Sequence, residues 1–261
     1  MTSRLRERRS VLADWSSRLA ILALPVLIIA AIGHRAGMME ATPTYGVMAV
    51  GFSLAALAVI AALAAFEAIW RDGRKGLGPA LRGFILGLAI LVIPAFGAWK
   101  IVSYPRLTDI STDLDDPPYF FAAYNNRPRD ANPISPPTDD DAAIQREAYP
   151  DIVPRYYPLD TVGVFGAVDA IVERRRWTVL ARRPPANSGE SGRLEAVAQT
   201  ILFGFSHDVV IRVAPEGEGT LVDMRSTARN GAHDFGADAE RIRKFFRDLD
   251  TALQGLGATP G

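Results

Sequence analysis

Three long apolar stretches occupy the first hundred residues of the chain, at about residues 17–34, 46–70 and 81–102. Each approaches or exceeds the roughly 20 residues that a helix needs to cross a bilayer core of about 30 Å. A buried core helix is usually shorter and keeps one polar face, whereas these stretches are apolar on all sides. The pattern predicts a transmembrane anchor of three spanning helices within residues 1–104.

A secretory signal peptide is the alternative interpretation of the first stretch, because arginines precede an apolar centre. No small-residue cleavage site precedes the polar segment that begins at His34, and two further apolar stretches follow. A spanning helix is therefore the favoured interpretation.

Positive charge alternates between the loops of the predicted anchor. The N-terminal tail is rich in arginine, the first loop has only Arg35, and the second loop carries Arg71, Arg74, Lys75 and Arg82. Cytoplasmic loops retain Lys and Arg. We therefore expect a multi-pass protein of the bacterial cytoplasmic membrane, with a cytoplasmic N-terminus and with residues 105–261 outside the cytoplasm.

Residues 105–158 are dense in Pro, Asp and Asn, which disfavours a long helix or a central strand. This pattern predicts an extended segment. The run Asp139 to Asp141 fits either a solvated loop or the first turn of a short helix, where acids interact favourably with the helix dipole. Three adjacent carboxylates do not converge unaided, so we expect no metal site there.

From Leu159 onward the pattern becomes regular. Apolar residues recur at helical spacing from Val162 to Val172 and again from Asp238 to Leu253. Between these two helices lie four segments of strand length, separated by clusters of Pro, Gly or Asn, at residues 177–183, 193–205, 208–215 and 220–228.

This order predicts an α+β domain with a mostly antiparallel four-stranded sheet and two helices packed on one face. Alternation along the strands assigns side chains to the two faces of the sheet. Val209, Ile211, Val213, Val222 and Met224 should point toward the helices. Arg212, Asp223 and Arg225 should lie on the opposite face.

Composition removes several classes of function. The formal net charge is zero and the soluble part has no run of Lys or Arg, so nucleic acid is not an expected partner. The chain has no Cys and only three histidines, His34, His207 and His233, so neither a thiolate site nor a His-rich metal centre is expected. No hydrolase, phosphate-loop or dinucleotide fingerprint is present, and no cofactor is expected.

Three motifs carry a resemblance to a known family: TDISTDLDDPPYF at residues 108–120, GFSHDVVIRVAPEGEGTLVDMRSTAR at 204–229 and DFGADAERIRKFFRDL at 234–249. Together they resemble the bacterial domain-of-unknown-function family numbered 1499. The resemblance covers nearly the whole soluble half and implies a domain often preceded by membrane helices, without an agreed activity. The chain departs from the family pattern around His233 and Asp238, so the resemblance implies no role for His233.

Carboxylates and arginines form the strongest candidate binding site that the sequence suggests. Such clusters can bind an anionic ligand, or they can be structural ion pairs that tie the extended segment to the sheet. Glycines near the last helix suggest turn geometry, and Asp234 could cap that helix. The candidate residues are Asp109, Thr112, Asp113, Arg212, Asp223, Arg225, Arg229 and Asp234.

Three hypotheses follow for function. The leading one is a non-enzymatic protein whose extracytoplasmic domain binds a small molecule, a lipid or an envelope protein beside the lipid bilayer. The second is an acid-base hydrolase of envelope material that uses Asp109 or Asp113 with His233 or Asp234; no catalytic residue is assigned. The third is a membrane-assembly subunit, which a groove lined by Gly83 and Gly87 would favour.

Overall fold

A computed structural model of the chain describes residues 8–257. It divides into two compact units, each described below by itself. One unit contains the chain up to Trp99 together with residues 202–204, and the other contains residues 100–201 and the chain from Phe205 onward.

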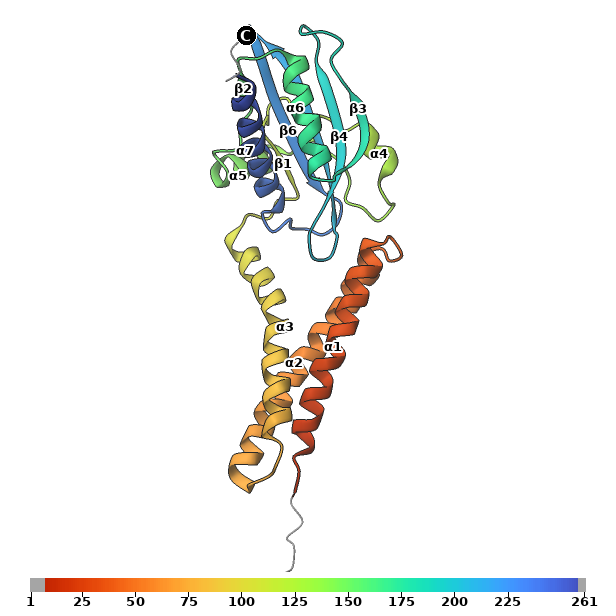
Figure 1. The fold of residues 1–261 in the computed structure, drawn as a ribbon, viewed down its shortest axis with the longest axis vertical. Coiled ribbons are helices and arrows are strands. Elements are labelled where there is room, and N and C mark those ends of the chain that lie inside the picture. The colour runs from red at the N-terminus through yellow and green to blue at the C-terminus, as the bar shows by residue number, and fades with distance from the viewer. Residues whose placement is uncertain (1–7, 258–261) are drawn as a thin grey trace, which may run out of the picture. The chain divides into compact units, whose positions relative to one another are not determined.

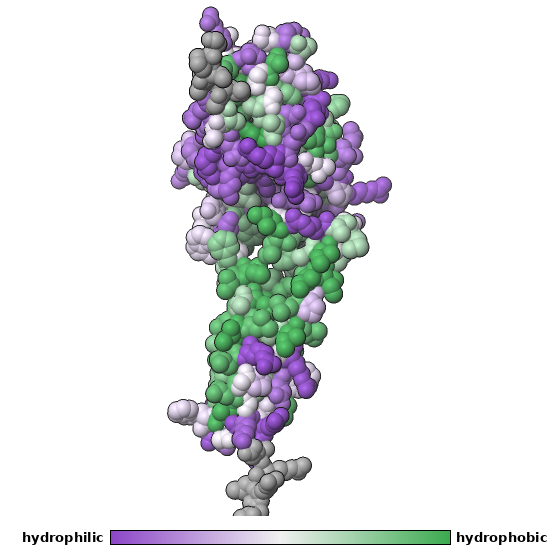
Figure 2. Space-filling model, in the orientation of Figure 1, coloured by the Kyte–Doolittle hydropathy of each residue, from purple (hydrophilic) through white to green (hydrophobic). Residues whose placement is uncertain are grey.

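The first unit is built from α1 (Val11–Arg35), α2 (Ala41–Asp72) and most of α3 (Leu77–Ser103). All three helices are long and apolar enough to cross a membrane, and Figure 2 shows their apolar side chains as a largely continuous green surface. Each helix is longer than the apolar stretch that predicted it, because polar residues continue the helical turns at both ends. At the start of α1, for example, the side chain of Ser10 accepts a hydrogen bond from Ala13 N.

Small residues let the three helices approach closely. A Cβ atom on Gly83 would lie 1.9 Å from Ser16 Oγ of α1, and one on Gly87 would lie 3.0 Å from the carbonyl oxygen of Ala55 in α2. Ser16 Oγ also donates a hydrogen bond of 2.8 Å to the carbonyl oxygen of Ala58. Gly83 and Gly87 therefore serve packing inside the three-helix unit.

We expect Gly83→Leu to destabilise the three-helix unit, because the new side chain would overlap Ser16 and force α3 away from α1. Overpacking of this kind costs about 1–3 kcal/mol or more. The measurement is the midpoint of SDS-induced unfolding of the full-length protein in mixed micelles. Gly97→Leu is the matched control, since a Cβ at Gly97 meets nothing within 4 Å. Equal midpoints for the two variants would contradict the packing argument.

The second unit contains an antiparallel sheet of six strands in the order β1-β6-β5-β4-β3, with β2 also paired to β6 (Figure 1). The four predicted strands correspond to β3 (Thr178–Arg183), β4 (Gly192–Gln199), β5 (Ser206–Glu216) and β6 (Gly219–Ala228). The predicted number of strands was wrong, because β1 (Asp109–Ser111) and β2 (Arg155–Tyr157) pair with the outer edge of β6. Each has only three residues within the Pro-rich segment, too few for a periodic pattern.

The predicted strand at residues 193–205 also extended too far. β4 ends at Gln199, and residues 200–205 form the connection to β5. This connection is closed by hydrogen bonds from Thr200 N to Phe205 O and from Phe205 N to Thr200 Oγ1, both 2.9 Å.

Helices α6 (Thr161–Arg174) and α7 (Ala237–Gly257) pack on one face of this sheet, as predicted (Figure 1). α6 begins after Asp160, whose side chain accepts a hydrogen bond from Gly163 N. The main core joins apolar residues of both helices to the inward positions of β5 and β6, which include Val209, Ile211, Val213, Val222 and Met224. Strand alternation therefore assigned these faces correctly.

The first part of the segment before α6, about residues 113–137, covers the other face, and its later residues join the main core and the edge of the sheet. The whole segment contains two short helices, α4 (Ala122–Asn126) and α5 (Asp139–Ala148). Phe120 and Ala123 pack on Val210 of β5 in a second, smaller apolar cluster. The Thr138 side chain accepts a hydrogen bond from Asp141 N, so the run Asp139 to Asp141 forms the first turn of a short helix. This was one of the two expected interpretations.

Candidate functional site

The sheet face opposite α6 and α7 carries a layer of paired charges, covered by residues 113–137. We call it the charged layer. Most of its members lie on β1, β4, β5 and β6, Arg229 follows directly on β6, and Arg127 comes from the covering segment. The charged layer consists of Arg127, Arg212, Arg225 and Arg229 with Asp109, Asp208, Asp223 and Glu195.

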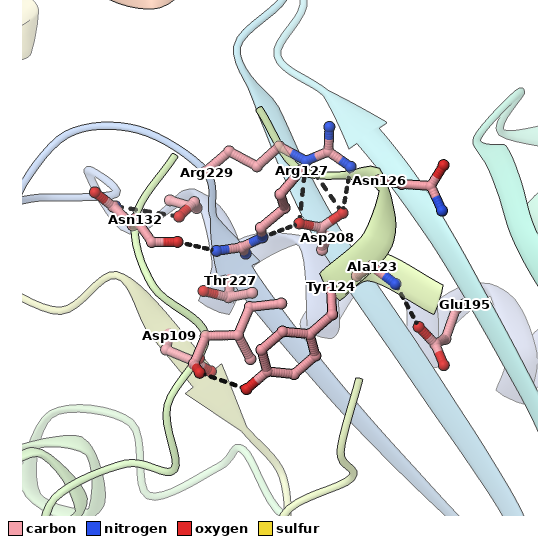
Figure 3. A network of polar contacts seen from close by, with 12 residues as sticks. Asp109, Ala123, Tyr124, Asn126, Arg127, Asn132, Glu195, Asp208, Thr227 and Arg229 are labelled. Carbon is pink, nitrogen blue, oxygen red and sulfur yellow. Dashed lines mark hydrogen bonds and ion pairs between the residues drawn. The ribbon is translucent and has the colours of Figure 1, made fainter. Parts of the chain in front are cut away.

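Asp208 lies at the centre of this layer and is fully buried. Arg229 Nη2 and Nε donate to its carboxylate at 2.6 and 3.0 Å, and Arg127 Nε donates at 2.6 Å (Figure 3). Both arginine side chains are themselves at most one-tenth exposed. A second guanidinium nitrogen of Arg127 donates to the carbonyl oxygen of Asn132, which fixes the covering segment over the sheet.

Asp109 and Arg225 form a two-pronged ion pair with both N–O distances at 2.8 Å. Arg225 also donates to the carbonyl oxygen of Ser135 at 2.6 Å. Burial raises the pKa of the Asp109 carboxyl, while the Arg225 guanidinium favours its charged form. The pair thus connects β1, β6 and the covering segment.

Arg212 joins three carboxylates. Its nitrogens donate to Asp223 at 2.9 Å, to Asp113 at 3.2 Å and to Asp116 at 2.6 Å. Burial raises the pKa of Asp223, and Arg212 opposes that shift. Thr112 lies beside this group and exchanges two hydrogen bonds of 2.9 Å with the backbone of Met224.

Glu195 has backbone amides as its partners, where the other acids of the charged layer have arginines. Its carboxylate accepts hydrogen bonds from the amides of Phe121, Ala122 and Ala123, at 2.9 to 3.1 Å, where α4 begins. Figure 3 shows the last of these contacts. A buried acid on β4 therefore holds the start of a helix in the covering segment.

The structure brings together most of the predicted site residues. Asp109 lies with Arg225, Asp113 and Asp223 lie with Arg212, and Thr112 lies beside them. Arg229 is in the same layer, bonded to Asp208. Asp234 is elsewhere: its carboxylate accepts hydrogen bonds from Gly236 N and Asp238 N at the start of α7, as a helix cap does.

Sequence reasoning missed Arg127, Asp208 and Glu195. Asp208 follows the same alternation that placed Arg212 on the polar face, so the pattern contained a signal for it. Arg127 lies in an irregular segment and had no such signal.

The groups of the hydrolase hypothesis each have separate structural partners. His233 Nε2 contacts the carbonyl oxygen of Tyr104 at 3.2 Å, and its Nδ1 accepts from Phe235 N at 2.8 Å. Asp109 is bound to Arg225, and Asp113 accepts from the amides of residues 115 and 116. The hydrogen bonds named here tie Asp109 and Asp113 to groups other than His233 and Asp234, while His233 Nδ1 lies 3.9 Å from Asp234 Oδ1.

A cavity of about 470 Å³ opens beside the ion pair of Asp109. Its base is formed by residues 106–109, and its walls come from residues 132–137 and 231–232. Arg106 brings a positive charge to the lining, Asp109 and Asp141 bring carboxylates, and three prolines bring apolar surface. The volume is within the range of about 300–1,000 Å³ that is common for small-molecule sites.

These features define an α+β domain with an ion-paired sheet face, preceded by three candidate membrane helices. The chain belongs to the family described as "Protein of unknown function (DUF1499)", whose model matches residues 109–249, more than half of the chain. The resemblance drawn from the three motifs is therefore confirmed.

Comparisons with other known proteins add no function. No curated protein matches the chain. Among solved structures, CalU16 from Micromonospora echinospora is 18% identical over 41% of this chain and 74% of its own, with a TM-score of 0.28. The vertebrate conserved region of human METTL16 is 19% identical over 40% and 85%, with a TM-score of 0.26. TTHA0849 from Thermus thermophilus is 18% identical over 41% and 97%, with a TM-score of 0.21.

Proposed function

We propose that this protein is a multi-pass protein of the bacterial cytoplasmic membrane whose extracytoplasmic domain binds a small zwitterionic ligand. The orientation rests on the basic residues of the tail and second loop and on the single arginine of the first loop. The binding role rests on the cavity beside Asp109, which is the observation that carries the proposal.

The lining of this cavity fits a ligand with both a negative and a positive group. Arg106 is exposed and uses Nε to donate to the carbonyl oxygen of Ala232. Its terminal nitrogens could bind an anionic group. Asp109 and Asp141 supply negative charge for a cationic or hydroxyl group, and Pro133, Pro136 and Pro137 supply apolar contact.

The charged layer supports this role by making the base of the cavity rigid. Arg225 holds Asp109 from below and holds the carbonyl of Ser135 in the wall, so base and wall are fixed by one side chain. A rigid site loses less conformational entropy on binding than a loose one.

The experiment is native mass spectrometry of the full-length protein extracted gently from its own membranes, with a denatured control. We expect an added small mass that is lost on denaturation. Replacing both Arg106 and Asp141 with Ala should reduce its occupancy about tenfold or more, because a hydrogen bond to a charged group contributes about 1.5–3 kcal/mol.

Replacing both Glu240 and Lys244 with Ala is the matched control, because it removes an exposed ion pair on α7, outside the cavity lining. An added mass that persists in the cavity variant would place the ligand elsewhere. If no added mass is found, thermal shift with phosphocholine, betaine and free amino acids is the second measurement. No shift with any of them would count against a zwitterion site.

A further inference from the structure

The connection between β4 and β5 presents two large aliphatic side chains to solvent. Ile201 is 93% exposed and Leu202 is 54% exposed, although β4, whose residues are largely buried, ends only two residues before Ile201. Gly204 adopts a φ of +73°, which an L side chain rarely adopts, and the hydrogen bonds between Thr200 and Phe205 close the turn. The connection is thus a defined turn whose apolar side chains at positions 201 and 202 are exposed to solvent.

This connection lies at the end of the sheet where the chain arrives from α3. Arg229 N donates to Ser206 O at the start of β5, and Ala228 N donates to Thr108 O just before β1. In the same region Asp234 N donates to Leu107 O. The opposite end of β5 and β6 is the hairpin at residues 216–219, which carries two glutamates.

A third apolar side chain is held at this end. Phe235 has a φ of +58°, unusual for a residue with a side chain, and is 38% exposed. Lys100 Nζ donates to its carbonyl oxygen at 3.1 Å, and its ring lies 5.2 Å from that of His233. A non-glycine residue is therefore kept in a strained conformation while part of its ring remains exposed.

Chain connectivity indicates what covers these side chains. α3 is a candidate membrane span that ends at Ser103, and the six-residue step from there to Asp109 can cover at most about 20 Å. Near its end α3 carries Trp99 and Lys100, residue types that favour the headgroup level of a bilayer. The length of this connection thus limits how far the start of β1, at the end of the sheet that holds Ile201 and Phe235, can lie from the end of α3.

We propose that Ile201 and Phe235 form a membrane-contact surface that inserts into the headgroup region of the bilayer. The occupant is lipid. Apolar side chains beside basic and aromatic anchors bind to this region because they leave water without entering the hydrocarbon core. This surface is separate from the ligand cavity. The proposal is the same whether the domain lies on the cytoplasmic or the extracytoplasmic side of the membrane.

The natural chain has no Cys, so a single cysteine can be labelled cleanly. Ile201→Cys in the full-length protein, labelled with the environment-sensitive dye NBD, is reconstituted in nanodiscs of phosphatidylcholine and phosphatidylglycerol. Glu218→Cys is the matched control, since it is exposed in the hairpin at the other end of the sheet. Leu202→Cys is a second reporter in case the first variant folds poorly.

We expect NBD at position 201 to emit at shorter wavelength than NBD at position 218 and to lose most of its emission when brominated lipids replace ordinary ones. An insertion depth of roughly 5–10 Å is typical of interfacial segments, so lipids brominated near the headgroup should quench best. Aqueous emission at both reporter positions, without quenching by brominated lipid, would overturn the proposal. A blue-shifted emission that brominated lipid leaves unchanged would also overturn it, because protein would then cover the surface.

Discussion

Replacing Asp208 with Ala is expected to lower the free energy of unfolding of the sheet domain by about 3–5 kcal/mol, the usual cost of breaking a buried ion pair from one side. The substitution would leave Arg127 and Arg229 buried without the carboxylate that both contact. Because typical domains are stable by only about 5–15 kcal/mol, this loss would be a large part of the total stability.

Pulse proteolysis of the full-length protein in nanodiscs across a urea series measures this effect, since cleavage reports the unfolded fraction. Asp116→Ala is the control. It also removes an acid from an arginine, but the Asp116 side chain is 82% exposed, so the expected change is within about 1 kcal/mol. Similar urea midpoints for the two variants would show that the charged layer contributes little to stability.

The stability of the domain should fall as pH rises through neutrality, because of Asp234. Burial, together with the nearby charge of Asp238, raises the pKa of Asp234 from 3.8 to about 7. The folded state therefore binds this proton more tightly than the unfolded state. Its contribution to stability is fully present below about pH 4 and is lost as pH rises through about 7.

Asp238 shifts in the opposite direction. His207 and Arg241 favour its charged form against the cost of burial and lower its pKa to about 2, so its contribution is constant above about pH 4. Between about pH 4 and about pH 7, the free energy of unfolding should change because of Asp234 by an amount on the order of 1–4 kcal/mol, at 1.36 kcal/mol per pKa unit.

Thermal unfolding of the full-length protein, followed from about pH 8 to about pH 5, tests the effect of Asp234. Asp234→Asn is the comparison, because it keeps an acceptor for the helix start and cannot titrate. Burial also raises the pKa of Asp109 and Asp223, so the informative quantity is the difference between the two proteins. We expect a steeper pH dependence in the natural protein. Parallel curves would mean that Asp234 does not titrate in this range.

The sheet could be predicted from the sequence where its strands were long. In β5 and β6 the alternation of apolar and charged residues was enough to place Arg212 and Asp223 on the same face of the sheet, and the structure pairs them across the two strands. The strands β1 and β2 could not be found this way. They exist because the edge of β6 has unpaired backbone groups that a nearby extended chain can bind, and this depends on tertiary structure.

The candidate site was predictable to the same extent. Alternation identified the arginines on the polar face, but their partners depend on how a Pro-rich segment is folded over the sheet. The pairing of Asp208 with Arg127 joins residues 81 positions apart, and the bonds of Glu195 to α4 join residues 72 to 74 positions apart. No local pattern specifies contacts at such separations.

The pairing of β1 with β6 also sets an order of events during synthesis. Asp109 leaves the ribosome long before Arg225, 116 positions later, and the strand and helix that complete the domain, β6 and α7, also follow β1 at a long distance in the chain. Contacts at such separations form slowly, since a long loop must close first. The segment after α3 must therefore wait as an unfolded polar chain beside the membrane until the C-terminal part arrives. Its high content of Pro and Asp suits that interval, because such a chain has little tendency to aggregate.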